Sequence, residues 1–278
     1  MTHTSVTLRI PTHITGFFSV HRADAPERSG SRGAGITLTE PVSVEVLHDG
    51  NGITRLNGSS TTVEAVEVVK NRMQTAVSIE VETKVPIGAG FGVSGALALG
   101  TAFGINQFTQ TKRTQNELVT IAHVADVESG TGLGDVVAQA YGGIPLRLEP
   151  GAPGYGVVDG IPASRPIEYV SFGELSTPDI LEGDTSLISE AGEAALESVQ
   201  ADPTLETVMQ ASRSFAQQTG LLTERIRTVI EDVEAVGGHA SMAMLGQTVF
   251  AIDTGLSTAG YNPHRCEVAS AGIEFISR

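Results

Sequence analysis

Polar and apolar residues alternate along several short segments in the first half of the chain. Residues 5–10, 43–47 and 77–83 place apolar side chains at about every second position, which is the pattern of a half-buried strand. Pro11 follows the first of these segments. Because proline has no N–H group to donate to a neighbouring strand, we expect that strand to end there. Residues 144–148 are predicted to form a further strand.

A helical spacing of apolar residues appears in the same half. Residues 62–73 place four apolar side chains on one helix face, those of Val63, Val66, Val69 and Met73. This spacing is typical of a helix that packs on a sheet. Residues 93–108 and 115–128 are predicted to form two more helices.

The composition changes after residue 148. Residues 149–166 are rich in proline and glycine, which is typical of a connecting segment, and we expect the boundary between domains 1–150 and 151–278 there. Beyond it we expect strands near 168–172, 242–245, 247–252 and 273–276, three helical stretches between 185 and 236, and a short helix at 256–259. Because strands and helices mix without regular β-α alternation, the predicted fold class is α+β with two domains.

Charge narrows the function classes. The 278 residues include 32 Asp and Glu against 17 Lys and Arg, a formal net charge of −15. Such a surface repels phosphate backbones, so nucleic acid is not an expected partner. Lysine occurs only at Lys70, Lys84 and Lys112. This composition favours a salt-rich cytoplasm, where ions screen the repulsion between carboxylates; an ordinary acidic enzyme is the alternative.

The sequence carries no membrane or disulfide signal. No apolar run approaches the roughly 18 residues of a membrane span, and the N-terminal residues lack a signal-peptide pattern. The single cysteine, Cys266, excludes internal disulfides and fits a reducing compartment. We therefore expect a cytoplasmic protein that does not contact a membrane.

Glycine is abundant, with 32 residues against roughly 20 for average usage, and it clusters in residues 86–96. That segment lies between a predicted strand and an apolar helix, and it contains Ser94 together with Gly88, Gly90, Gly92 and Gly95. Glycines let backbone N–H groups approach a ligand, and the helix N-terminus adds unpaired donors and partial positive charge. The segment is therefore a candidate site for a polyphosphate, although a glycine turn that only packs a strand on a helix has the same pattern.

Two other nucleotide-binding motifs fit this segment less well. No lysine follows the glycines, which excludes a Walker-type P-loop. Gly90, Gly92 and Gly95 spell G-x-G-x-x-G, and Glu117 lies downstream, so a dinucleotide fold is an alternative. That motif should directly follow the first strand of a βαβ unit, whereas several predicted elements precede this one.

Two further small-residue segments follow. Residues 128–137 form a second glycine loop that ends in Asp135, at the start of an apolar turn. An aspartate there either caps a helix or orients, and accepts a proton from, a hydroxyl that attacks a phosphoryl group. Residues 237–246 form a third patch, between a predicted helix and a predicted strand.

These three segments in this order, preceded by residues 11–13 after the first strand, resemble the GHMP kinase superfamily. The resemblance covers essentially the whole chain, and the segment 86–96 is its most specific part. It implies the GHMP kinase fold, an α+β N-terminal ATP-binding domain and a ferredoxin-like C-terminal domain with ATP and substrate between them. Within the superfamily the chain is more similar to archaeal kinases that phosphorylate pantoate in coenzyme A biosynthesis, through residues 11–18, 29–35, 122–126, 132–135 and 240–248.

The resemblance implies roles for the catalytic and ATP-binding residues. Asp135 would orient or deprotonate the attacking hydroxyl, and Ser94 would act beside it. The phosphates would lie on Gly88, Gly90, Gly92 and Gly95 as well as Ser94. Mg²⁺ would be held by Ser94 and Asp126, with Glu128 as the alternative to Asp126; hard oxygen ligands suit this ion.

The same resemblance implies substrate-binding residues. Arg147, on a predicted strand between Leu146 and Leu148, would bind the substrate carboxylate through its guanidinium group. His123, Ser31 and Thr177 would line the same pocket. His13 stands where mevalonate kinases have a lysine, and an imidazole does not replace a permanent ammonium group. We therefore expect His13 to support the site rather than to bind phosphate.

Other functions remain open at this point. A GHMP kinase for homoserine or mevalonate, a non-catalytic nucleotide-binding sensor of the same fold, and a nicotinamide-dependent oxidoreductase are the alternatives. The expected cosubstrate and metal are ATP and Mg²⁺, and the expected partner is a small-molecule substrate. A homodimer is expected too, although the sequence does not determine the oligomeric state.

Overall fold

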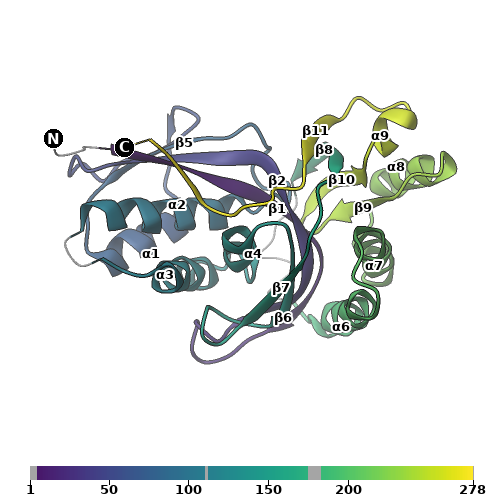
Figure 1. Ribbon diagram of the computed structural model, residues 1–278, viewed down its shortest axis with the longest axis horizontal. Helices are drawn as coiled ribbons and strands as arrows, with labels where there is room; N and C mark the ends of the chain where they lie inside the picture. Colours follow the sequence, from purple (N-terminus) through teal and green to yellow (C-terminus); the bar gives the residue numbers. More distant parts are fainter. Residues whose placement is uncertain (1–4, 110–111, 175–182, 278) are drawn as a thin grey trace.

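The computed structural model describes residues 5–109, 112–174 and 183–277, which form two β-sheets with helices packed on them (Figure 1). The first sheet has the strand order β12-β1-β2-β5-β3-β4, and β6 and β7 branch from β2. Its strands are β1 (Ser5–His21), β2 (Gly30–Leu47), β3 (Thr54–Leu56), β4 (Ser59–Ser60), β5 (Ser78–Glu82), β6 (Ile144–Glu149), β7 (Val157–Ile161) and β12 (Glu274–Ser277). The mixed composition of sheets and helices confirms the predicted α+β class.

The strands β1 and β2 form one long antiparallel hairpin. Their register runs from Ser5 opposite Leu47 to His21 opposite Gly30. The expectation that Pro11 ends the first strand is therefore wrong. The register shifts between Pro11 and Thr12, and such an irregularity lets the pairing continue past a residue without an N–H group.

Four helices accompany the first sheet: α1 (Glu64–Met73), α2 (Val93–Phe108), α3 (Gln115–Glu128) and α4 (Asp135–Tyr141). The helix α2 is buried along most of its length. Gly100 and Gly104 lie directly on Val44 and Val46 of β2, so small residues let this helix approach the sheet closely. A capping box between Thr114 and Glu117 starts α3. The predicted helices 93–108 and 115–128 are confirmed.

The second sheet contains β8 (Pro166–Glu174), β9 (Ala240–Ala243), β10 (Gly246–Ile252) and β11 (His264–Glu267). Its order β11-β8-β10-β9 is antiparallel throughout. This is the 4-1-3-2 strand order of a ferredoxin-like sheet. Its helices are α7 (Leu205–Gln218), α8 (Glu224–Ala235) and α9 (Gly255–Thr258), whereas α6 (Ser186–Ala201) packs on α7 and on β1 and β2 of the first sheet.

The division expected at residue 150 does not coincide with the boundary between the two sheets. The strand β7 pairs with β6 in the first sheet, and β12 returns to pair with β1 (Figure 1). The strand β1 also contacts the second half directly, since Met244 donates its N–H to the carbonyl oxygen of Thr15. Both halves are thus built on β1. Among the described residues, no helix is long and apolar enough to cross a membrane.

Candidate active site

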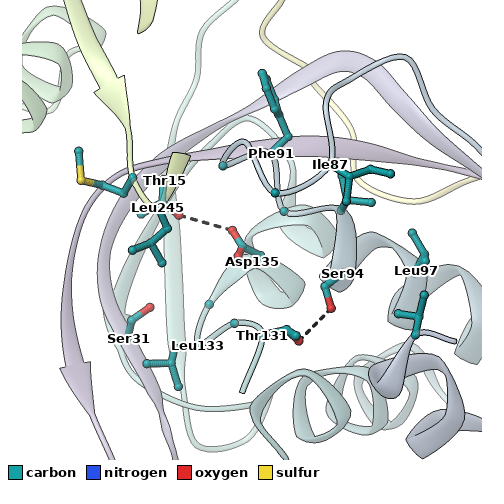
Figure 2. A pocket seen from close by; sticks show the side chains of 18 of the residues that line it. Thr15, Ser31, Ile87, Phe91, Ser94, Leu97, Thr131, Leu133, Asp135 and Leu245 are labelled. Carbon is teal, nitrogen blue, oxygen red and sulfur yellow. Dashed lines mark hydrogen bonds between the residues drawn. The ribbon is translucent and has the colours of Figure 1, made fainter. Parts of the chain in front are cut away.

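A cavity of about 470 Å³ lies where the first glycine loop, the start of α2, the loop before α4 and the β9–β10 turn meet (Figure 2). One part of its wall is apolar, with side chains of Leu56, Val63, Ile87, Val93 and Leu97. The other part carries polar and charged groups, among them Thr15, Ser31, Ser94, Thr131, Asp135 and Arg147. The cavity therefore joins an apolar region to a polar one.

The first glycine loop is held in place from both halves of the molecule. The N–H group of His13 in β1 donates to the carbonyl oxygen of Phe91, and the Thr248 hydroxyl of β10 donates to that of Ala89. Gly90 has a φ of +87°, and a side chain there would lie 3.0 Å from the Met244 carbonyl oxygen. The loop therefore needs glycine at this position, both for its backbone conformation and for its packing.

The start of α2 presents unpaired backbone donors at the cavity. Its N-cap, Gly92, has a left-handed backbone (φ +63°) and makes no side-chain cap. Ala96 is the first residue whose N–H bonds back into the helix, to the Gly92 carbonyl oxygen. Gly88, Gly90, Gly92 and Ser94 line the cavity. The N–H groups of the first turn and the positive end of the helix dipole therefore suit an anion.

Ser94, Thr131 and Asp126 form a hydrogen-bonded group beside this helix end. Asp126 is 2% exposed, and its Oδ1 accepts from the Thr131 hydroxyl at 2.6 Å and from the Ser94 hydroxyl at 3.1 Å. Burial, together with the nearby negative charge of Asp135, raises the pKa of Asp126 to about 7. A side chain at Gly132 would collide with the carboxylate, so glycine leaves room for it.

Asp135 begins α4, and one of its oxygens is held by side chains of β1. Its Oδ1 lies 2.6 Å from Nδ1 of His13. The same oxygen accepts from the Thr15 hydroxyl at 3.4 Å (Figure 2). Burial opposes the ionisation of Asp135, but the hydrogen bond from His13 and the positive charge of Arg147 outweigh it and lower its pKa. The side chain is 23% exposed. Asp135 is therefore an ionised carboxylate on the cavity wall.

Arg147 lies on β6 and is 2% exposed. Neither its Nε nor its Nη1 has a hydrogen-bond partner among the described residues. Burial lowers the pKa of Arg147 to about 10, against the attraction of Asp135, so the group stays charged at neutral pH. A side chain at Gly134 would lie 2.5 Å from the Ser31 hydroxyl oxygen and 2.6 Å from Nε of Arg147. The glycine thus makes room for both, and the cavity wall contains a buried cation with unused donors.

Some of the other predicted residues lie elsewhere. His123 is 1% exposed and does not line the cavity; its Nε2 lies 2.8 Å from the Ser29 carbonyl oxygen. Gly95 packs α2 on α4, since a side chain there would lie 2.9 Å from Oε1 of Gln139. Glu128 points away and pairs with Arg72 at 2.6 Å. These positions argue against side-chain contacts of His123 and Glu128 with a ligand, whereas the N–H group of Gly95 belongs to the first turn of α2, before the first helical hydrogen bond at Ala96. Thr177 lies outside the described residues.

Sequence reasoning missed Gln139 and Thr131. Gln139 is fully buried, and its Nε2 donates to the carbonyl oxygens of Pro11 and Gly92 at 3.0 Å each. It therefore ties α4 to β1 and to the start of α2. Thr131 lies in the second glycine loop and links Asp126 with Ser94. A polar residue on the apolar face of a short helix was the only signal for Gln139.

Comparisons with known proteins agree with this geometry. Residues 60–143 match the family model of the GHMP kinases N terminal domain, and together with the fold and the cavity they define a GHMP kinase. A structure described as a phosphotransferase related to the CoA biosynthesis pathway is 29% identical, with a TM-score of 0.86 and 98% of each chain covered.

The chain belongs to the pantoate kinase family. It is 37% identical to the pantoate kinase of Methanocaldococcus jannaschii over 87% of this chain and 90% of that relative. A structure of MDDEF in complex with MVAPP, AMPPCP and magnesium, 15% identical, has the same fold (TM-score 0.75, 99% of each chain covered). The predicted enzyme class, a kinase of the GHMP type, is confirmed by this membership, which does not support the oxidoreductase alternative.

Proposed function

We propose that this protein transfers the γ-phosphoryl group of ATP to the hydroxyl group of pantoate, giving 4-phosphopantoate for coenzyme A biosynthesis. One observation carries the proposal: an unpaired, buried guanidinium and an ionised aspartate share one cavity with the exposed N-terminus of α2. Pantoate offers a carboxylate for Arg147 and a hydroxyl for Asp135. The triphosphate of ATP suits the N-terminus of α2.

The apolar and polar regions of the cavity favour one direction for ATP. The apolar wall near Leu56, Ile87 and Leu97 suits the adenine base, because ligand pockets bury the apolar parts of a ligand mainly against hydrophobic side chains. The phosphates would then lie along Gly88–Gly92 and the first turn of α2. This order places the γ-phosphate beside the Asp135 and Arg147 region.

Ser94 and Asp126 are the residues proposed to hold Mg²⁺. Their oxygens are 3.1 Å apart, next to the proposed phosphate site, and Mg²⁺ binds through one or two carboxylates, substrate phosphates and water. Among the described residues no cluster of three His, Cys, Asp or Glu side chains could hold a metal alone, which fits an ion held mainly by nucleotide. When bound, the ion would neutralise charge that develops on the phosphates.

The chain's own residues would carry out the transfer. Arg147 binds the substrate carboxylate and so fixes the distance of the hydroxyl from the phosphates. Asp135 accepts the hydroxyl proton as the hydroxyl oxygen bonds to the γ-phosphorus and the bond to the β-phosphate oxygen breaks. ADP leaves with the electron pair of the broken bond. The backbone N–H groups of α2 stabilise the negative charge on the transferred group.

Other acceptors of this fold fit less well or need a direct test. Homoserine carries a carboxylate that Arg147 could also bind, but its ammonium group adds a positive charge close to that guanidinium. Mevalonate carries a carboxylate and is not excluded by this charge. A non-catalytic sensor would have no use for an ionised Asp135 beside the phosphate site.

An acceptor screen tests the proposal. ADP release and ³¹P NMR of the product would be followed with pantoate, homoserine, mevalonate and no acceptor, in concentrated KCl. We expect turnover with pantoate alone, a loss of about 10²- to 10⁴-fold in kcat for Asp135→Asn, and unchanged binding of an ATP analogue. Asp159→Asn, on the exposed strand β7, is the matched control. Turnover with another acceptor would refute the substrate assignment.

The cytoplasmic location and the homodimer belong to this proposal as well. A cytoplasmic location agrees with the use of ATP and with a single free cysteine, Cys266. Sedimentation of the purified protein measures the oligomeric state.

A further inference from the structure

His13 lies directly behind the proposed catalytic aspartate. It is fully buried, and its Nδ1 is 2.6 Å from Oδ1 of Asp135. It does not line the cavity. Its backbone N–H bonds to the Phe91 carbonyl oxygen, and a side chain at Gly35 would collide with its ring. The imidazole is therefore confined to one place and cannot turn toward a phosphate.

The hydrogen-bonding capacity of the site determines the tautomer. An ionised carboxylate only accepts, so the proton of a neutral imidazole must sit on Nδ1 to make the bond to Asp135. The other ring nitrogen, Nε2, is buried and has no hydrogen-bond partner among the described residues. Were Nε2 protonated instead, Nδ1 would direct a lone pair at the carboxylate and the Nε2–H would be buried without an acceptor, which is costly.

The charges around the ring favour a neutral imidazole. Burial lowers the pKa of His13, against the attraction of Asp135, and the Arg147 guanidinium of β6 lowers it further. Asp126 of α3 is the other titratable group near Asp135. A second permanent cation beside Arg147 would lower the basicity of Asp135 further, whereas a neutral donor holds the carboxylate without adding charge.

The two carboxylate oxygens of Asp135 therefore have different surroundings. Oδ1 receives the bonds from both His13 and Thr15. Among the described residues, none donates a hydrogen bond to Oδ2. One oxygen is held and the other is free to accept a proton.

We propose that His13 is a positioning residue: as a neutral imidazole protonated on Nδ1, it holds Oδ1 of Asp135 and leaves Oδ2 to the acceptor hydroxyl. The inference rests on the proposed function for the role of Asp135. His13 then donates a hydrogen bond to the Asp135 carboxylate and makes no contact with phosphate.

NMR spectra determine the tautomer of His13 without an activity measurement. In ¹⁵N-histidine-labelled protein, two-bond ¹H–¹⁵N spectra distinguish a protonated ring nitrogen from a bare one. We expect the His13 signals, assigned by their loss in His13→Asn, to show hydrogen on Nδ1 and a bare Nε2, with no protonation of Nε2 at neutral pH. Hydrogen on Nε2, or a doubly protonated ring at neutral pH, would overturn the proposal. The result is independent of which acceptor the enzyme uses.

Kinetic measurements distinguish a positioning role of His13 from a role in packing alone. His13→Leu removes the donor, and His13→Asn keeps a neutral N–H near the position of Nδ1. We expect kcat to fall about 10- to 100-fold in His13→Leu, with the KM for ATP unchanged and the acid limb of the kcat–pH profile moved to higher pH. His13→Asn should recover most of kcat and the wild-type profile. The matched control, His48→Asn on the surface, should change neither.

Two kinetic results would contradict the proposal. Equal losses in both variants with an unmoved pH profile would show that the ring only fills space. A higher KM for ATP at constant kcat would show that His13 binds phosphate. If His13→Leu does not fold, the asparagine variant and the spectra still decide. Absence of wild-type turnover with pantoate refutes the proposed function instead, and leaves the tautomer result standing.

Discussion

Asp126 near the end of α3 and Asp135 at the start of α4 are separated by one short glycine loop, yet their pKa values move in opposite directions. Asp126 is surrounded by hydroxyl groups, and burial with a like charge nearby raises its pKa to about 7. Asp135 is partly buried, with 23% of its side chain exposed, but an imidazole donor and a guanidinium group lower its pKa. The same side chain thus acquires two different protonation behaviours within one site.

The difference assigns the two carboxylates different tasks. A carboxylate held by neutral hydroxyls gains most when a cation arrives, which suits a metal ligand. A carboxylate that is already ionised can accept a proton as soon as the substrate binds. Divergent pKa values of neighbouring acids are a general sign of such a division of roles. The following substitutions test whether Asp126 and Asp135 have these different roles.

Arg147→Met removes the cation from the Asp135 side and should have a larger effect than the Asp126 substitution below. We expect kcat/KM for pantoate to fall about 10²- to 10³-fold, through loss of two charge-assisted hydrogen bonds of about 1.5–2 kcal/mol each. The KM for ATP should not change. Steady-state kinetics with each substrate varied in turn measure both. Unliganded Arg147→Met should also melt at a higher temperature than the wild type, because it no longer buries an unpaired charge.

The controls for this variant are Arg147→Lys and Arg72→Met. The lysine keeps the charge but not the planar pair of donors, so it should restore only part of the activity. Arg72 is paired with Glu128 on the surface, and its loss should leave kinetics unchanged. A loss of kcat at constant KM for pantoate would contradict carboxylate binding by Arg147.

Asp126→Asn removes the charge on the other side and should have a smaller effect. We expect the free Mg²⁺ concentration that gives half-maximal kcat to rise about 10- to 100-fold, with the KM for pantoate unchanged. Rates measured over a range of free Mg²⁺ test this. Glu128→Gln is the matched control, since Glu128 points away and pairs with Arg72. If Glu128→Gln shows the effect and Asp126→Asn does not, the metal assignment is wrong.

The two aspartates should also change stability with pH in opposite directions in metal-free protein. For Asp126, the pKa in the folded protein is about 7, above the ordinary 3.8. Its contribution to the free energy of unfolding is therefore complete below pH 3.8 and is lost as the pH rises toward 7. For Asp135 the folded pKa is lowered, so its contribution is full above pH 3.8 and is lost as pH falls further. Each slope is at most about 1.4 kcal/mol per pH unit.

Urea unfolding in EDTA between pH 3 and 8 measures these slopes. The difference in unfolding free energy between wild type and Asp126→Asn should favour the wild type increasingly as pH falls from 7 to 4. The difference for Asp135→Asn should be flat over that range and should shrink below pH 3.8. Parallel curves for the two variants would show that their environments do not differ.

Local signals in the sequence predicted several elements well. The helices 93–108 and 115–128 were predictable because apolar spacing and the Thr114 cap lie within the segments themselves. The continuation of β1 beyond Pro11 was not, because the strand is completed by pairing with β2 along a shifted register. The place of β12 beside β1 likewise depends on residues at the other end of the chain.

The site shows the same limit. Glycine spacing located the loop and the helix start, and strand alternation indicated that Arg147 faces away from its neighbours; its proposed role stays a prediction. The position of His13 behind Asp135 depends on two segments 122 residues apart. His123 was expected to contact the substrate, but its Nε2 lies within hydrogen-bond distance of the Ser29 carbonyl oxygen. No local pattern distinguishes a ligand histidine from one that supports a neighbouring turn.

The continuous hairpin of β1 and β2 determines how the enzyme can open and close. These strands are 17 and 18 residues long, and residues of both, such as Thr15 and Ser31, line the cavity. A rigid-body hinge between two lobes would have to break their pairing. We therefore expect entry of substrates and exit of ADP to depend mainly on the short glycine-containing segments at the rim.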